Sequence, residues 1–316
     1  MNPQKRIEWV DLAKGIGIIL VVYGHVILGI HDAKLGLSGI GYTIQHSVIY
    51  TTHMPLFFFL SGIFAVKWVK REPKVAIHQK FTSLIIPYLI WGIIQGLIMQ
   101  VFAGQTNNAQ GLSQVLRLPI KPYAQFWFLY DLWWIFLIYY VAIHVLKLPT
   151  KILFGFSIVL FLGSPWLNLW EFWRIFYQLP FFLVGTMVIE HQDNLSKLKP
   201  IILIPLFIVV NGLFIFFNFN TFVTNIFSFI VAMVGILLVI SLVQRFRNGV
   251  LDYIGKNSMP IYLMHLLGAA GTRIILLKLG VQLVSVHLIL GTLVGLFAPL
   301  IALQVFKLLK IDKYLL

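Results

Sequence analysis

The residues best suited to chemistry lie near the start of the chain, where Lys14 and His25 bracket the apolar run KGIGIILVVYGH. On an α-helix, a separation of eleven residues corresponds to about 1100° of rotation and about 16 Å of rise, which predicts both side chains on one face. Asp11 lies three residues before Lys14, close to that face. Hydrocarbon tolerates few ionisable groups, so an acid, a base and an imidazole on one stripe point to a functional site.

An imidazole inside the membrane can take a proton from a hydroxyl group near neutral pH, which makes His25 a candidate general base. The alternative is a histidine that hydrogen-bonds a neighbouring helix and stabilises packing. Asp11 and Lys14 are expected at the membrane surface, where they either bind a charged ligand or pair with each other.

A second cluster is THMPLFFFLSG, which begins with His53 and ends at Ser61 and Gly62. His53 enters its predicted helix from the side toward which His25 points, so the two histidines are expected to approach each other. Pro55 predicts a kink, because proline removes a backbone hydrogen bond. Ser61 and Gly62 also fit a close helix crossing, since small residues let two backbones approach.

Two later segments carry further candidates. QFWFLYDLWW contains Trp127 and Asp131, and an acid inside an apolar span is a functional candidate unless it lies at the membrane edge. GKNSMPIYLMH contains Tyr262 and His265, three residues apart and therefore on one helix face. The candidate substrate-binding residues are His53, Ser61, Trp127, Asp131, Tyr262 and His265.

Two other patterns predict helix ends and helix packing. Asn257 or Ser258 is expected to cap a helix that has Pro260 in its first turn. Gly291 and Gly295, four residues apart, are typical of close helix packing.

Composition sets the class of protein that must position these residues. Of the 316 residues, 59% are hydrophobic and 11% are charged, whereas a soluble domain has about 25% charged residues. Apolar stretches near the length of about 20 residues needed to cross a bilayer recur along the chain. The sequence therefore predicts an all-α integral membrane protein in a single transmembrane domain over residues 1–316. Hydropathy places ten helices near residues 13–31, 48–66, 82–103, 124–146, 152–167, 178–190, 201–217, 222–243, 258–277 and 284–306.

The excess of basic residues is predicted to set the orientation of the protein in the membrane. All but six of the 24 Lys and Arg residues fall in loops predicted to lie on the same side of the membrane as the N-terminus. Such asymmetry places both termini in the cytoplasm of a multi-pass protein of the cell (plasma) membrane. Nucleic acid is therefore not an expected partner, whereas membrane lipids are. The longest loops are predicted at 32–47, 67–81, 104–123, 190–200 and 244–257.

Several kinds of site are excluded. The chain has no cysteine, which rules out disulfides, thiolate metal sites and a cysteine nucleophile. No close metal-ligand spacing occurs among the nine histidines, so no metal is predicted. Gly15 and Gly17 lack the third glycine and the preceding strand of a dinucleotide-binding loop.

Taken together, five blocks in order resemble acyltransferase family 3, the membrane-bound O-acyltransferases that modify surface glycans. They are RIEWVDLAKGIGIILVVYGH, HMPLFFFLSG, FWFLYDL, LPFFLVG and GKNSMPIYLMH. The string WVDLAKGIGI is most similar to the fucose 4-O-acetylase-like branch.

The resemblance implies that an acyl group, usually acetyl from cytoplasmic acetyl-CoA, reaches a sugar hydroxyl across the membrane. The acceptor would be a cell-envelope or exported polysaccharide or its lipid-linked precursor. Lys14 and His25 match the family's paired motif, with His25 as general base or transient acyl acceptor. Asp11 belongs to the branch signature, and His53 and His265 match family histidines.

The chain departs from the family before the third predicted helix. Many members carry two arginines three apart there, whereas this chain has Lys80 and Ser83. Arg71, Lys74 and Lys80 are the expected contacts of the acyl-CoA phosphates, supported by the basic character of residues 67–80.

Three function classes compete, of which a purely structural membrane subunit ranks last because it leaves the ionisable stripe unexplained. The leading one is an integral-membrane O-acyltransferase. The second is a transporter or flippase of a glycan intermediate that uses His25, Asp131 and His265 as a proton relay. A transporter more often has broken helices in matching halves of the chain, and no such pair is evident in the sequence.

Overall fold

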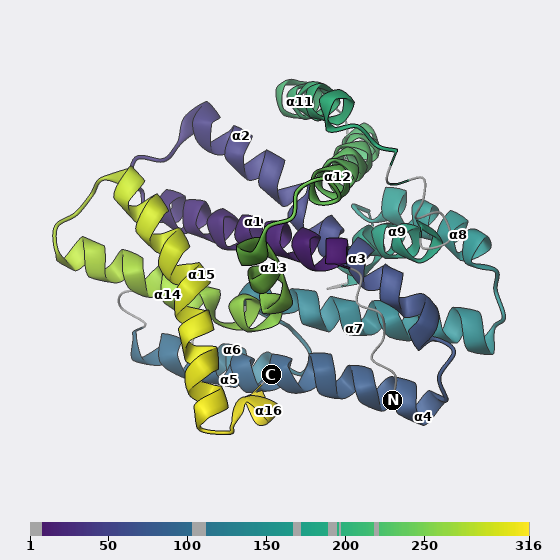
Figure 1. Cartoon of the computed structure of the whole chain (residues 1–316), viewed down its shortest axis with the longest axis horizontal. Coiled ribbons are helices and arrows are strands. Elements are labelled where there is room, and N and C mark those ends of the chain that lie inside the picture. Colours follow the sequence, from purple (N-terminus) through teal and green to yellow (C-terminus); the bar gives the residue numbers. More distant parts are fainter. Residues whose placement is uncertain are drawn as a thin grey trace. The chain divides into compact units, whose positions relative to one another are not determined.

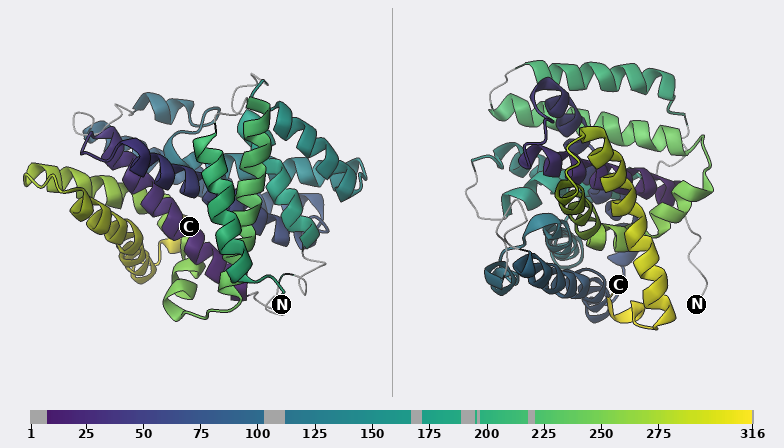
Figure 2. Two further views of the ribbon diagram at one scale, coloured as in Figure 1. Left: turned by 90° about the horizontal axis from the view of Figure 1, so that it is seen from above. Right: turned by 90° about the vertical axis from the view of Figure 1, so that its left-hand side faces the viewer.

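The computed structural model of the chain describes residues 8–102, 112–166, 172–188, 195, 197–217 and 221–315. Its regular structure in these ranges is helical, with short 3-10 and π-helical turns and no strand (Figures 1 and 2). The prediction of an all-α polytopic membrane protein is confirmed.

Each of the ten predicted spans coincides with an apolar helix. Seven are long and apolar enough to cross a membrane: α1 (Glu8–Asp32), α2 with α3 (Gly39–Trp68), α4 to α5 (Pro73–Val101), η2 to η3 (Ala124–Val145), most of α12 (Val223–Val243), α14 (Ser258–Lys278) and α15 (Val284–Leu308). Three apolar helices are shorter: α8 (Thr150–Gly163), α9 (Phe172–Val188) and α11 (Pro200–Phe216). The number of crossings and the cytoplasmic termini stay predictions.

Four predicted loops contain helices instead. They are α2 (Gly39–Tyr50), α4 (Pro73–Lys80), α6 (Leu112–Arg117) and α13 (Gly249–Lys256). All four are short and contain polar residues, so a search for long apolar runs does not detect them. In α13, Asn248 acts as N-cap, because its side chain accepts hydrogen bonds from the backbone N–H groups of Val250 and Leu251. A further short helix of the described residues is α16 (Asp312–Leu315).

The second predicted span is two helices rather than one kinked helix. The helix α2 ends at Tyr50, and α3 (His53–Trp68) begins after Thr51 and Thr52. Pro55 therefore lies in the first turn of α3, where backbone N–H groups have no intrahelical partner. The expected kink takes the form of a helix break at residues 51–52, just before Pro55.

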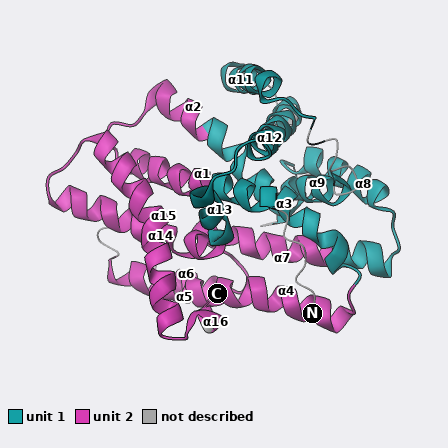
Figure 3. Ribbon diagram, viewed as in Figure 1, with its two compact units in different colours: residues 1–18, 47–70, 139–258 teal, residues 19–46, 71–138, 259–316 magenta. Residues whose placement is uncertain are grey.

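The chain forms two compact units, coloured in Figure 3. Unit 1 comprises residues 1–18, 47–70 and 139–258, and unit 2 comprises residues 19–46, 71–138 and 259–316. The helix α1 contributes its first part to unit 1 and its second part to unit 2.

Unit 1 is built around a backbone-to-backbone crossing of α3 and α9. A Cβ atom on Gly62 would overlap the carbonyl oxygen of Phe182, and one on Gly185 would overlap the carbonyl oxygen of Phe59. The close crossing predicted from Ser61 and Gly62 is confirmed. The first turns of α1 cross α13 in the same way, with Gly255 against the carbonyl of Asp11.

In unit 2, the second part of α1 packs with α14 and α15 through small residues. A Cβ atom on Gly295 would lie 2.7 Å from Val22, and one on Gly291 would lie 3.2 Å from Val26. On α14, a Cβ atom on Gly268 would lie 3.1 Å from the carbonyl oxygen of Val294. The packing role predicted for Gly291 and Gly295 is confirmed, and in this packing His25 of α1 lies against α14.

Candidate functional site

Two histidines from opposite ends of the chain meet in unit 2. The ring centroids of His25 on α1 and His265 on α14 are 5.0 Å apart, with the rings tilted by 46°. His265 is fully buried, whereas His25 is partly accessible. The sequence predicted His25 as a functional residue, but it gave no reason to expect His265 as its neighbour.

Hydrogen bonds fix the tautomer of His265. Its Nδ1 lies 2.8 Å from the carbonyl oxygen of Tyr262 and 3.2 Å from that of Ile261. A carbonyl oxygen only accepts, so Nδ1 carries the hydrogen and donates it. The Nε2 atom of the neutral ring then carries a lone pair. Within the described ranges, this buried Nε2 has no hydrogen-bond partner.

A buried polar network holds the first turns of α14. The Tyr262 hydroxyl donates to the backbone carbonyl of Gln125 in η2 (Ala124–Phe126). The side-chain amide of Gln125 donates to Gln95 Oε1 at 2.7 Å and to the carbonyl of Leu263 at 3.4 Å. Gln95 lies in α5 (Ile86–Val101), so three elements are tied together one turn from His265.

The sequence interpretation missed both glutamines. The signal that points to them is a polar residue inside an apolar stretch, as for Gln95 in IWGIIQGLIMQ. A buried amide needs a partner, and each glutamine supplies one to the other.

Trp127 and Asp131 begin α7 (Trp127–Tyr140), also in unit 2. Asp131 is fully buried within the protein. Phe128, between them, packs against the Tyr262 ring with centroids 5.4 Å apart. The structure thus brings Asp131, Tyr262 and His265 into one neighbourhood beside His25, while Trp127 is half-buried.

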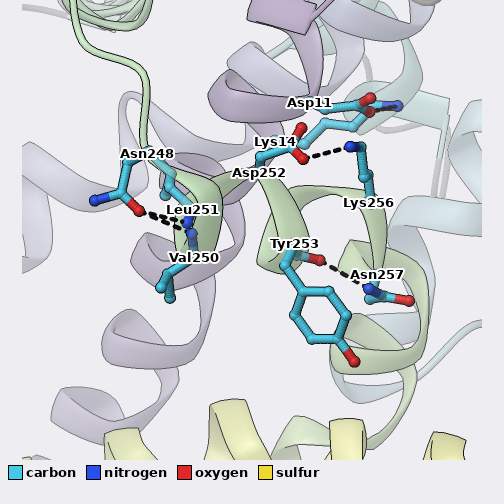
Figure 4. Close-up of polar contacts among 9 residues, drawn as sticks. All are labelled: Asp11, Lys14, Asn248, Val250, Leu251, Asp252, Tyr253, Lys256 and Asn257. Carbon is cyan, nitrogen blue, oxygen red and sulfur yellow. Dashed lines mark hydrogen bonds and ion pairs between the residues drawn. The ribbon is translucent and has the colours of Figure 1, made fainter.

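Lys14 and Asp11 form an ion pair in unit 1, with 3.6 Å between Nζ and Oδ1. Asp11 is buried, whereas the Lys14 side chain is 30% exposed, and its Nζ lies 5.3 Å from the Phe64 ring centroid. On α13, which crosses α1 here, Lys256 pairs with Asp252 (Figure 4). The pairing of Asp11 with Lys14 is confirmed, and the 30% exposure of Lys14 leaves its ammonium accessible to an anion.

Asn257 ends α13 and directly precedes Ser258, the first residue of α14, so its predicted role as a cap of α14 stays a prediction. Its side-chain amide donates to the carbonyl of Tyr253 at 2.8 Å, one turn back on α13 (Figure 4). Because α13 was not expected, its end could not be recognised. Pro260 does lie in the first turn of α14.

His53 and Ser61 also belong to unit 1. His53 is buried, with Nδ1 2.6 Å from the carbonyl of Ile49 and its ring 5.0 Å from that of Tyr50. The Ser61 hydroxyl donates to the carbonyl of Phe57 on its own helix at 2.8 Å. The expected approach of His53 to His25 stays a prediction.

A surface groove of about 950 Å³ runs along α4 in unit 2. Arg71, Lys74 and His78 line it together with the apolar side chains of Val75, Ile77 and Phe81. Lys80 is not part of its lining, because its Nζ lies 3.7 Å from the Phe136 ring centroid on α7. Two cations beside apolar surface suit a ligand with an anionic part and an apolar part.

Chemically, unit 2 offers a partly accessible imidazole held against a buried imidazole of fixed tautomer. Such a group can accept a proton from a hydroxyl or an acyl group from a thioester. A hydroxyl substrate and a cationic groove for an anionic donor would complete a group-transfer site.

Comparisons with known proteins agree with this chemistry. A family model described as an acyltransferase domain, Acyl_transf_3, matches residues 7–304. The Nodulation protein NolL of Sinorhizobium fredii (strain NBRC 101917 / NGR234) is 30% identical over 190 residues, which are 58% of this chain and 50% of that protein. The similarity thus spans about half the length of this relative. No solved structure matches the chain significantly.

Proposed function

We propose that this chain, which belongs to the acyltransferase family that matches residues 7–304, transfers an acyl group to a hydroxyl of a carbohydrate. Its family and its apolar helices make it a membrane acyltransferase. The branch within the family, the donor and the acceptor are parts of the proposal. The observation that carries it is the His25–His265 contact in a chain of this family.

The proposed donor is acetyl-CoA. Coenzyme A has phosphates at one end and an uncharged pantetheine arm at the other. The groove along α4 offers Arg71 and Lys74 beside apolar side chains, which fits both parts. Lys14, partly exposed in the first turns of α1, is a second candidate contact for the donor.

The proposed acceptor is a sugar of a cell-envelope or exported polysaccharide, or of its lipid-linked precursor. As the sugar oxygen attacks the thioester carbonyl, His25 takes the hydroxyl proton. The carbon–sulfur bond then breaks, and the imidazolium returns the proton to the thiolate. General-base assistance of this kind is worth about 10²–10⁴-fold in rate. In a two-step route, His25 would first carry the acyl group itself.

The charge asymmetry supports an orientation in which the donor binds from the cytoplasm. With both termini cytoplasmic, the loops that carry most Lys and Arg face the acetyl-CoA pool, in the plasma membrane. The acceptor hydroxyl would then be reached from the other side.

The test is acyl transfer by purified protein or membranes from labelled acetyl-CoA to candidate glycans. We expect His25→Ala to lose at least about 100-fold of the transfer rate, the lower end of the general-base range. His144→Ala is the matched control, because the His144 side chain is exposed and stacks on Tyr140. In the sequence, His144 lies far from His25. Equal transfer by wild type and His25→Ala would remove His25 from the mechanism. Glycan export without acyl transfer would favour a transporter.

A further inference from the structure

The hydrogen bonds of His265 determine which of the two imidazoles can donate a hydrogen bond to the other. His265 donates from Nδ1 to the carbonyl of Tyr262 at 2.8 Å, so its Nε2 can only accept while the ring is neutral. That Nε2 is buried without a hydrogen-bond partner in the part of the chain that the structure describes. A buried acceptor without a partner is costly, so such an atom calls for a donor.

Among the described residues, His25 and Tyr262 have ring contacts with His265. The Tyr262 hydroxyl already donates to the carbonyl of Gln125, so His25 is the one of the two that can provide this donor. Ring centroids 5.0 Å apart are close enough for an N–H···N hydrogen bond between two imidazoles. A neutral imidazole has one N–H and one lone pair, so donating to His265 leaves the lone pair of His25 on its other nitrogen.

We propose that His265 is a positioning residue for His25, through an N–H···N hydrogen bond from His25 to Nε2 of His265. The proposal rests on the proposed function, in which His25 accepts the hydroxyl proton. His265 selects the His25 tautomer and orients its lone pair, as the third group of a catalytic triad orients the base. When His25 is protonated, the same bond stabilises the imidazolium. His265 keeps its own proton on Nδ1 throughout, so no proton leaves the pair by this route.

Substituting His265 by glutamine or by asparagine distinguishes a positioning role from a packing role. Glutamine places its amide near the position of Nε2 and can accept from His25, but it loses the bond to Tyr262. Asparagine places its amide near the position of Nδ1, so it keeps the bond to Tyr262 and cannot reach His25. We expect His265→Gln to retain kcat within about tenfold of wild type. His265→Asn and His265→Leu should lose about 100-fold or more, with little change in the KM for acetyl-CoA.

A kcat of His265→Asn equal to or above that of His265→Gln would overturn the proposal, because the bond to Tyr262 would then be what matters. In the His25→Ala background, the His265 substitutions should cause no further loss, since the two residues act as a unit. A further loss of tenfold or more in that background would also overturn it.

A measurement on the unsubstituted protein covers the case in which the His265 variants fail to fold. Nitrogen NMR of the ¹⁵N-histidine-labelled protein in bilayers at neutral pH should show one histidine protonated at Nδ1 whose Nε2 accepts a hydrogen bond. That hydrogen bond should disappear in His25→Ala. An Nε2-protonated His265 would overturn the proposal. Wild-type protein that transfers no acyl group would instead refute the proposed function, and the NMR result would stand by itself.

Discussion

Gly62 on α3 and Gly185 on α9 each face the main-chain carbonyl of the opposite helix, so neither position has room for a side chain. Two backbones in direct contact make many van der Waals contacts, which drive helix association within a membrane. The motifs HMPLFFFLSG and LPFFLVG, which the sequence offered as family blocks, therefore include the packing contact of unit 1.

Alanine at Gly62 should destabilise the protein. A methyl group there would meet the carbonyl oxygen of Phe182, which cannot move without shifting α9. Overpacking of this kind costs about 1–3 kcal/mol, so the melting temperature in detergent should fall measurably. Gly29 is the matched control, because a Cβ there would meet only the tip of the Arg273 side chain, which can rotate away. Equal effects of Gly62→Ala and Gly29→Ala would contradict the backbone crossing.

Substitution of Gln125 by leucine should destabilise unit 2. It removes the donor to Gln95 Oε1 at 2.7 Å and leaves that buried amide without its partner. An unsatisfied buried polar group costs about 1–3 kcal/mol. Because replacing both partners of a buried hydrogen bond can be nearly neutral, Gln95→Leu combined with Gln125→Leu should be more stable than Gln125→Leu alone. Thermal unfolding of the three variants measures this, and strictly additive losses would argue against the network.

Charge reversal in the α4 groove should weaken donor binding. Arg71→Glu with Lys74→Glu places two negative charges where the coenzyme A phosphates are proposed to bind, so the KM for acetyl-CoA should rise by about tenfold or more with kcat little changed. The effect should shrink with added salt, because exposed charges are screened. Lys147→Glu with Lys151→Glu is the control, since it reverses two charges in another loop predicted on the same membrane side. An unchanged KM, or equal shifts in both double variants, would exclude the groove.

The sequence by itself determined the class of the molecule. Long apolar runs can only satisfy their backbone groups in a membrane as helices, and all ten predicted spans coincide with apolar helices. The periodicity of a single helix is likewise local, so Asp11, Lys14 and His25 could be assigned to one stripe of α1 without any tertiary information. Short polar helices such as α4 and α13 lack this apolar signal, so composition predicts loops at these positions.

Tertiary structure decided which of the candidate residues meet. His25 and His265 lie near opposite ends of the chain, and only the packing of α1 with α14 and α15 through Gly291, Gly295 and Gly268 puts their rings in contact. The tautomer of His265 depends on where the carbonyl of Tyr262 lies, which residue types alone do not specify. Contacts between distant segments follow from side-chain shape and backbone approach, whereas helical class and helical face follow from local composition and period.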